Sequence, residues 1–321
     1  MPLDPELTDR LKRVLAAVEP LLPRPVQRVD WETCHAANWR RSTFAGTLEP
    51  VPSVEAMHLD DLLGIEPQKQ AVEDNTRQFL AGLPANNALL WGVRGTGKSS
   101  LVRALLHAYA DRGLRIIQVD KDDLVSLPAI VDEVKAQPYR FIVFSDDLSF
   151  ETGDASYKVL KSALDGSVYG VPDNVLIYVT SNRRHLVPEY ESDNRGAMLV
   201  NGEVHHGEAV EEKISLSGRF GLWVAFHTFS QELYVDVVRR WVDKLAGKLG
   251  VPVAWTGEGE AAAILWSQKK GDRSGRIAYQ FACDWVGRSV LQRRGAGADA
   301  PRRPAGEGAA PAAGAKSTGR V

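Results

Sequence analysis

Short apolar runs alternate with stretches of helical spacing through the middle of this chain. Five of these runs have the length of buried strands, at residues 88–91, 114–119, 141–144, 175–179 and 222–226. Before and between these runs, apolar residues recur at helical intervals, at about 67–80, 99–106, 123–136 and 155–164. Strands that alternate with helices predict βαβ units, so we expect an α/β fold with a parallel sheet flanked by helices.

The pattern changes at about residue 231, after which only helical spacing is found, at 233–249, about 259–269 and 277–291. We therefore expect an α/β domain at 56–229 and a small α-helical lid domain at 230–294. Residues 1–55 are interpreted as an N-terminal leader that is partly helical, with a weakly amphipathic stretch at 7–22. Residues 295–321 are mostly Ala, Gly and Pro without apolar periodicity, so we expect a disordered tail.

The loop after the first apolar run, residues 92–99, reads GVRGTGKS and fits the phosphate-binding pattern GxxxxGK[ST]. Glycines let such a loop curl so that backbone N–H groups point at phosphate oxygens, and the following helix adds the positive end of its dipole. Lys98 would reach the β- and γ-phosphates, and the Ser99 hydroxyl would bind Mg²⁺. The predicted nucleotide-binding residues here are Gly92, Val93, Arg94, Gly95, Thr96, Gly97, Lys98, Ser99 and Ser100.

Two carboxylates follow the apolar run at 141–144, and an amide follows the run at 175–179. A phosphate-binding loop needs an acid at the tip of a neighbouring strand to hold hydrated Mg²⁺, so Asp146 joins Ser99 as a predicted metal ligand. Asp147 can polarise the attacking water, and Asn182 can orient that water beside the γ-phosphate. These two residues are candidate catalytic groups.

Two arginines complete the candidate catalytic set. Arg219 lies just before the last apolar run and can project into the site of a neighbouring subunit, where it would stabilise charge in the transition state. Arg276, at the start of the last helix, can reach the γ-phosphate and couple its presence to the helical domain. Arg273, in the same polar stretch, is the competing candidate for this second role.

Composition narrows the class of protein. Among 321 residues, 44% are hydrophobic and 25% are charged, and the net charge of -2 does not indicate a dedicated nucleic-acid binder. Cys34 and Cys283 lie far apart and in no metal-ligand spacing, which is typical of reduced thiols in the cytoplasm. No stretch approaches the roughly 20 apolar residues that span a bilayer. The sequence thus predicts a cytoplasmic protein without membrane contact.

In this order, the motifs resemble those of the AAA+ ATPases over most of the chain, about 59–291. Residues 92–99 resemble Walker A and 141–147 resemble Walker B. Residues 62–65 resemble the segment that packs on adenine, which adds Leu63 and Ile65 to the predicted nucleotide contacts.

The same resemblance assigns the remaining candidates. Asn182 corresponds to the first sensor, Arg219 to the arginine finger and Arg276 to the second sensor. It implies ATP and Mg²⁺ as ligands and a homo-oligomer, either a ring or a partial ring. More narrowly, the short segments at residues 82–87, 119–124 and 146–150 resemble those of a bacterial AAA+ family, which is named for its domain of unknown function 815. That family carries no known substrate.

Two departures from the AAA+ pattern bear on mechanism. AAA+ proteins usually have Glu where this chain has Asp147, whose carboxylate is set back by about one C–C bond, so hydrolysis is expected to be slow unless Glu151 compensates. Residues 120–138 lack the aromatic-hydrophobic-Gly loop with which threading enzymes grip polypeptide. Residues 168–170, Val-Tyr-Gly, have this character but lie after the Walker B segment and are interpreted as a plain turn.

Two further stretches stand out. Residues 185–213 are long for a connection between strands, and insertions of this length are often functional. The pair His205-His206 within it can bind a metal, but a solvated partner-binding loop is the favoured interpretation. Residues 39–41, Trp-Arg-Arg, can contact phosphate or a partner, although a packed Trp beside surface charges is favoured.

These features favour an ATP-hydrolysing AAA+ protein that remodels an unidentified protein or nucleic-acid partner. The alternative is an ATP-gated binding module or loader with negligible turnover, which the Asp147 substitution favours. A monomeric GTPase is disfavoured because the guanine-reading motif Asn-Lys-x-Asp does not occur. A P-loop kinase is disfavoured by the arginines at 219 and 276.

Overall fold

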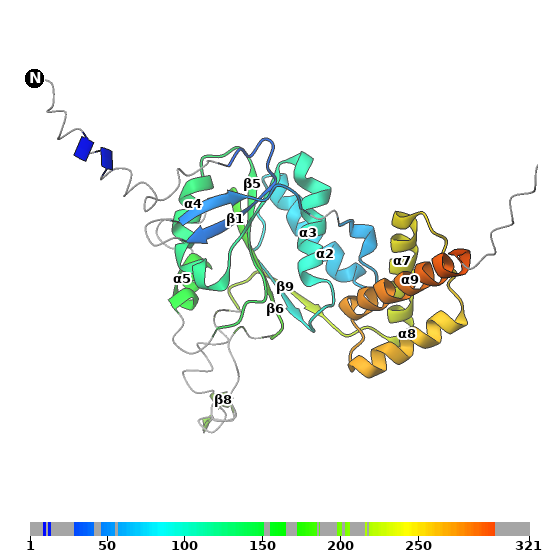
Figure 1. The fold of residues 1–321 in the computed structure, drawn as a ribbon. Helices are drawn as coiled ribbons and strands as arrows, with labels where there is room; N and C mark the ends of the chain where they lie inside the picture. The colour runs from blue at the N-terminus through cyan, green and yellow to red at the C-terminus, as the bar shows by residue number, and fades with distance from the viewer. Residues whose placement is uncertain are drawn as a thin grey trace, which may run out of the picture.

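A seven-stranded sheet forms the centre of the fold (Figure 1). The structure, a computed structural model, describes residues 9–10, 12–13, 29–41, 46–54, 57–150, 155–164, 172–184, 186, 198–200, 203–205, 216 and 218–298. The strand order in the sheet is β2-β1-β4-β5-β6-β3-β9. The strands are β1 (Ala36–Arg41), β2 (Gly46–Pro50), β3 (Ala88–Gly92), β4 (Leu114–Gln118), β5 (Arg140–Ser145), β6 (Val175–Ser181) and β9 (Leu222–Phe226).

The five predicted apolar runs form five adjacent parallel strands of this sheet, from β4 to β9 in its spatial order. In register, Ala88 of β3 lies opposite Tyr178 of β6 and Leu222 of β9. The carboxyl ends of β3, β5 and β6 therefore lie together at one end of the strands. The residues that precede β9 lie at the other end. The prediction of a parallel α/β sheet is confirmed.

Two strands from the N-terminal region extend this sheet. β1 pairs in parallel with β4, and β2 pairs antiparallel with β1. The expected leader boundary at residue 55 therefore needs correction, because residues 36–50 contribute strands to the α/β sheet. Trp39 on β1 is buried, whereas Arg40 and Arg41 are exposed and form ion pairs with Glu49, Asp120 and Asp123. This confirms the interpretation of a packed Trp beside surface charges.

Helices cover both faces of the sheet (Figure 1). Successive residues of a strand point to opposite faces, and β3 follows this rule. Ala88 and Leu90 belong to the same core cluster as α2 and α3, whereas Leu89 belongs to the cluster of α4 and α5. The helices of this domain are η2 (Leu59–Asp61), α2 (Glu66–Leu80), α3 (Lys98–Tyr109), η3 (Ala110–Arg112), η4 (Lys121–Ser126), α4 (Leu127–Val134) and α5 (Ala155–Leu164).

Prolines mark the start of two of these helices. Pro67 lies in the first turn of α2, as expected, because proline has no N–H to donate and is suited to that position. The helix predicted at 123–136 begins later than expected. A 3₁₀ helix occupies 121–126, and the α-helix starts at Leu127, with Pro128 in its first turn.

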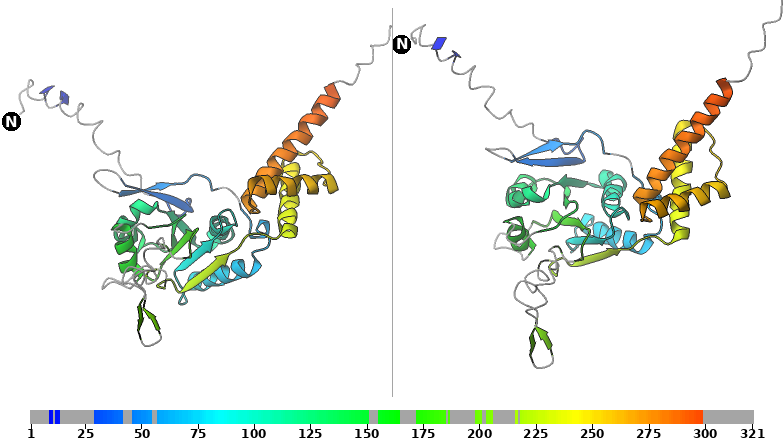
Figure 2. Two further views of the ribbon diagram at one scale, coloured as in Figure 1. Left: turned by 90° about the horizontal axis from the view of Figure 1, so that it is seen from below. Right: turned by 60° about the horizontal axis from the view of Figure 1, so that its bottom comes forward.

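Three helices after β9 form the lid, which lies at one end of the α/β domain (Figures 1 and 2). They are α7 (Gln231–Leu249), α8 (Gly257–Lys270) and α9 (Gly275–Ala298). The Ser230 hydroxyl caps α7 by accepting a hydrogen bond from the Leu233 N–H. α9 projects away from the α/β domain and ends later than predicted, so the tail expected from 295 does not start before 299.

A partly buried ion pair holds the lid to the α/β domain. Lys244 of α7 donates to the carboxylate of Asp61 in η2, which also accepts a hydrogen bond from the His58 N–H. Burial on its own would raise the pKa of Asp61, but these hydrogen bonds and the positive charge of Lys244 lower it below its usual value. The contact thus stabilises the ionised carboxylate.

Several predicted features fall outside the described residues. These are Glu151, the turn at 168–170, His206, the rest of the tail at 299–321, and most of the stretches 7–22 and 185–213. Within 185–213 the structure describes a two-stranded antiparallel hairpin, β7 (Met198–Val200) and β8 (Glu203–His205). In the described part of the chain, no helix combines the length and apolar character needed to cross a bilayer.

Candidate functional site

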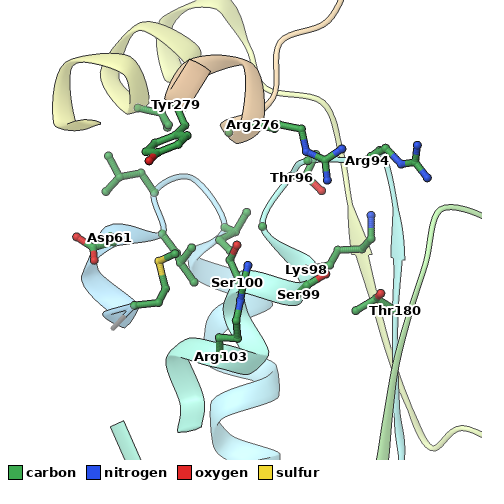
Figure 3. A pocket seen from close by; sticks show the side chains of 18 of the residues that line it. Asp61, Arg94, Thr96, Lys98, Ser99, Ser100, Arg103, Thr180, Arg276 and Tyr279 are labelled. Carbon is green, nitrogen blue, oxygen red and sulfur yellow. The ribbon is translucent and has the colours of Figure 1, made fainter. Parts of the chain in front are cut away.

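A cavity of about 550 Å³ opens where the carboxyl-terminal edge of the sheet meets the lid (Figure 3). The glycine loop, the ends of β5 and β6, the η2 segment and the lid helices α7 and α9 all contribute to its lining. Most predicted site residues line it, namely Leu63, Ile65, Arg94, Gly95, Thr96, Gly97, Lys98, Ser99, Ser100, Asp146, Asp147, Asn182 and Arg276. Gly92, Val93 and Arg219 are not among its lining residues.

The glycine loop between β3 and α3 has a backbone that only glycine adopts easily. Gly92, Gly95 and Gly97 have φ values of 129°, 80° and 105°. At Gly92 a side chain would also have no room, because a Cβ there would lie 2.0 Å from the carbonyl oxygen of Phe226. The loop leads directly into α3, whose first turn carries unpaired N–H groups suited to phosphate oxygens.

Lys98 is almost fully buried at the base of the cavity, with 6% of its surface exposed. Its Nζ donates to the carbonyl oxygens of Gly92 and Val93, both at 2.8 Å, and to Oδ1 of Asn182 at 3.2 Å. Gly92 and Val93, although outside the lining, thus hold the lysine. All three acceptors keep the ammonium group in place beneath the loop.

Burial and the neighbouring charges together set the pKa of Lys98. Burial lowers its pKa to about 8; the carboxylates of Asp146 and Asp147 oppose this shift, while the guanidinium groups of Arg94 and Arg276 add to it. A buried cation with other cations nearby gains from a polyanionic ligand, because phosphate oxygens would restore the solvation that burial removed.

Asp146 and Ser99 lie together as the metal prediction requires. Ser99 Oγ donates to Asp146 Oδ1 at 2.5 Å, and the Thr180 hydroxyl donates to the same oxygen. Thr180 was not among the predicted site residues. It precedes Asn182 by two residues, and the alternation of a strand places such residues on one face, so this spacing was an available signal.

Both carboxylate oxygens of Asp147 accept hydrogen bonds from side chains. The Asn182 amide donates to Oδ1, and the Arg94 guanidinium donates to Oδ2 at 2.7 Å. The backbone of Asp147 has a φ of 54°, the one positive value at a non-glycine residue within the described ranges. Asp is among the few residues that tolerate this conformation. The carboxylate is therefore fixed by its backbone and by two donors.

The lid touches the glycine loop directly. The backbone N–H of Arg276 donates to the Gly95 carbonyl oxygen at 3.3 Å, and a Cβ at Gly95 would lie 2.9 Å from Ser274 Oγ. Figure 3 shows the Arg276 side chain beside Thr96 and Arg94. Arg273 is not among the residues that line the cavity, so the geometry favours Arg276 as the residue that faces the nucleotide site.

The cavity has an apolar end between the η2 segment and the lid. Leu63 and Ile65 line it as predicted, and two aromatic side chains from the lid join them. These are Trp241 of α7 and Tyr279 of α9, whose rings meet edge to face with centroids 4.9 Å apart. The sequence did not reveal them, because aromatic residues at helical spacing look like ordinary core positions.

Arg103 also lines the cavity and was not predicted. It lies four residues after Ser99 on α3, a spacing that places two residues on the same helix face. That spacing was the signal that could have found it.

Arg219 lies far from this cavity along the sheet. It precedes β9, whose first residue Leu222 pairs with Ala88 at the start of β3, whereas the glycine loop follows the end of β3. Its backbone N–H donates to the Leu216 carbonyl oxygen at 3.2 Å. Arg219 therefore lies at the opposite end of the strands from the glycine loop and does not line the cavity of its own chain.

A known protein family matches most of this chain. The family described as "Protein of unknown function (DUF815)" matches residues 32–289. The chain belongs to the DUF815 family. No match was found among curated proteins.

Solved structures of the RuvB Holliday junction branch migration motor of Thermotoga maritima share the fold of this DUF815 protein. One proline-to-glycine variant of RuvB is 15% identical, with a TM-score of 0.52 over 75% of this chain and 68% of that chain. An alanine-to-serine variant is 15% identical with a TM-score of 0.50 over 74% and 66%. A further RuvB structure is 16% identical with a TM-score of 0.49 over 73% and 66%. The chain thus spans about two thirds of these proteins' length.

This DUF815 protein accordingly has a RuvB-like AAA+ fold, with a mostly parallel seven-stranded sheet and C-terminal helices. At this level of identity, the likeness to RuvB shows the fold alone. The roles of individual residues follow from the geometry of the cavity.

Proposed function

We propose that this protein is an ATPase that binds ATP with Mg²⁺, hydrolyses it at sites shared between subunits, and uses the cycle to remodel a protein or nucleic-acid partner. One observation carries the proposal. Lys98, Ser99, Asp146, Asp147 and Asn182 line a single cavity, although they follow three different strands. Phosphoryl transfer to water requires a lysine that binds phosphate and oxygen ligands that bind a metal ion. It also requires a carboxylate and an amide that act on the attacking water.

The residues present fit a magnesium ion. The Ser99 hydroxyl and the Asp146 carboxylate meet at 2.5 Å, and oxygen ligands of this kind are those that Mg²⁺ prefers. When bound, Mg²⁺ would neutralise charge on the β- and γ-phosphate oxygens. Lys98 and Arg276 add positive charge from the loop and from the lid.

In the proposed reaction, Asp147 accepts a proton from water as the water oxygen attacks the γ-phosphorus, and ADP leaves with the bridging oxygen. Asn182, which donates to Asp147, orients the same water. The short side chain of Asp147 places its carboxylate further from the reacting atoms than a glutamate would, which favours slow turnover.

We infer that Arg219 acts on the nucleotide of a neighbouring subunit. Its place at the edge of the sheet opposite the glycine loop supports this role and, with it, a homo-oligomer in the form of a ring or partial ring. Arg276 couples nucleotide to the lid through the contact of α9 with Gly95. The free cysteines Cys34 and Cys283 support a cytoplasmic location.

The test is ATP turnover per subunit measured over a range of protein concentrations, with Arg219→Ala as the comparison. A shared site predicts a rate per subunit that rises with concentration in the wild type and is lost in the variant. A rate in Arg219→Ala that equals the wild type at every concentration would contradict the intersubunit role.

The alternative is an ATP-gated binding module or loader with negligible turnover. The observation that favours it is the arrangement of Asp147, whose two carboxylate oxygens are both engaged by side-chain donors. In that case ATP would bind tightly, no concentration would yield turnover, and a partner would be bound or released according to the nucleotide present.

A further inference from the structure

We propose that Arg94 exchanges the carboxylate of Asp147 for the γ-phosphate of bound ATP, and so keeps the water-activating group engaged until that phosphate arrives. The inference rests on the proposed ATPase function and adds a control to the same site. Arg94 is then a positioning residue for Asp147 and a detector of the γ-phosphate within its own subunit.

The geometry starts from the glycine loop. Arg94 lies between two glycines with positive φ, and its side chain leaves the loop toward the end of β5. There its guanidinium donates to Asp147 Oδ2 at 2.7 Å, while the other carboxylate oxygen accepts from Asn182. These two donors fix the orientation of the carboxylate, and each takes up one lone pair of an oxygen that would otherwise be available to a water molecule.

Arg94 is at the same time one of the cations of the phosphate site. Figure 3 shows the side chains of Arg94, Lys98 and Arg276 gathered around the glycine loop. All three residues line the cavity. A γ-phosphate bound by Lys98 and Arg276 would therefore lie within the reach of the same loop that carries Arg94.

The ion pair is of a kind that a phosphate can replace. The side chains of Arg94 and Asp147 are 64% and 53% exposed, and exposed ion pairs stabilise proteins only weakly. An arginine that binds a phosphate in a partly enclosed site makes a stronger, charge-assisted contact. ATP would thus draw Arg94 away and free Oδ2 of Asp147, whereas ADP, which lacks the γ-phosphate, would leave the pair intact.

Two features of the sequence meet in this contact. One is an arginine at a position that the pattern GxxxxGK[ST] leaves open, and the other is Asp147 where AAA+ proteins usually have Glu. The left-handed backbone at Asp147, with a φ of 54°, aims its short side chain at Asn182 and Arg94. The exchange gives this departure at Asp147 a purpose.

The first test compares binding of ATPγS and of ADP to full-length protein. We expect Arg94→Ala to weaken ATPγS binding by about tenfold or more, because a charge-assisted contact is lost, and to leave ADP affinity within about twofold. Arg94→Lys should restore part of the ATPγS affinity. Arg77→Ala is the matched control, since Arg77 forms a similarly exposed pair with Asp74 on α2 and should leave both affinities unchanged.

The second test is a pair of crystal structures of the wild type, one with ADP and one with ATPγS and Mg²⁺. We expect the Arg94–Asp147 pair in the first and an Arg94–γ-phosphate contact in the second. Equal loss of ATPγS and ADP affinity in Arg94→Ala, no loss of either, or an intact pair in the ATPγS complex would overturn the proposal.

These readouts separate the proposal from the function on which it rests. If the wild type hydrolyses no ATP but Arg94→Ala still loses selectivity for ATPγS, the ATPase fails and the exchange stands as a binding switch. If the wild type hydrolyses ATP and Arg94→Ala keeps its selectivity, the exchange alone is overturned.

Discussion

Single residues in this site depend on backbone conformations that few side chains accept. Asp147 at a φ of 54° and Gly95 at a φ of 80° both lie in the left-handed region, one in the proposed catalytic set and the other beneath the lid. Strain of this kind is retained where the surrounding contacts hold it, and it is frequent at functional sites. Substitutions at these two positions therefore test the proposed chemistry and the contact of the lid with the loop.

Replacing Asp147 with Asn keeps the size of the side chain and its tolerance of positive φ, but removes the base. We expect turnover to fall by about 100-fold or more, because a general base contributes at least that much, while ATP affinity stays within about threefold. Steady-state turnover and equilibrium ATP binding measure the two quantities. Wild-type turnover in this variant would remove Asp147 from the mechanism.

Replacing Gly95 with Ala should disturb the contact between the glycine loop and the lid, where the new Cβ would also lie 3.1 Å from the Cβ of Arg276. The new Cβ would lie 2.9 Å from Ser274 Oγ at a φ of 80°, so we expect a loss of about 1–2 kcal/mol in the free energy of unfolding. Gly247→Ala is the control, because nothing lies within 4 Å of its Cβ and it lies inside α7. That change should stabilise the protein by about 0.5–1 kcal/mol, as measured by urea unfolding.

Among the elements, the junction of η2 with α7 joins the two parts of the molecule. Lys244 and the Asp61 carboxylate meet there with side chains that are only 25% and 11% exposed. A pair this far from water is worth more than one on the open surface, because removal of one partner leaves the other charge poorly solvated.

Asp61→Asn should therefore lower the free energy of unfolding by about 1–2 kcal/mol at neutral pH. The pKa of Asp61 lies below the ordinary value of 3.8 in the folded protein, so the unfolded chain takes up the proton first as the pH falls. Its contribution is complete above the unfolded pKa and is lost as the pH falls through the folded one. Urea unfolding at a series of pH values should show the difference between wild type and variant shrinking toward acid; a constant difference would assign it to packing instead.

The elements also show how far the sequence could predict the fold. Strands β3 to β6 and β9 were found because a strand covered on both faces is a continuous apolar run. β1 and β2 were missed because they lie toward the edge of the sheet, where polar residues such as Asn38 and Glu49 interrupt the apolar pattern. The lid helices were found because their spacing is regular over many turns.

The candidate site likewise contains features that the sequence could predict and features that it could not. The glycine loop and Asp146 were predictable because their chemistry is local in sequence. The contacts of Asp147 with Arg94 and Asn182 were not, because they depend on side-chain directions across three separate segments. Trp241 and Tyr279 could not be predicted for a further reason. They line the cavity only because the lid lies over the α/β domain, and this placement cannot be inferred from the sequence of the two helices.

For the whole molecule, the distance of Arg219 from its own glycine loop predicts that two defective subunits can repair each other. Lys98→Ala removes phosphate binding but leaves Arg219, and Arg219→Ala leaves the cavity intact. We expect each variant alone to lack turnover and an equimolar mixture to regain part of it, because Lys98→Ala subunits supply the missing arginine. ATP turnover of the mixture is the measurement, and the Lys98→Ala/Arg219→Ala double variant mixed with Arg219→Ala is the control that should stay inactive.

The long last helix has a mechanical consequence. α9 begins against the glycine loop at Gly95 and continues to Ala298, a length of about 36 Å for a helix of its 24 residues. A rotation of about 10° at its N-terminus would swing the far end by about 6 Å, on the scale of a full helical turn. If the proposed function holds, α9 would act as a lever that pivots beside the proposed phosphate site, and the arrival or loss of a single phosphate would be amplified at its far end.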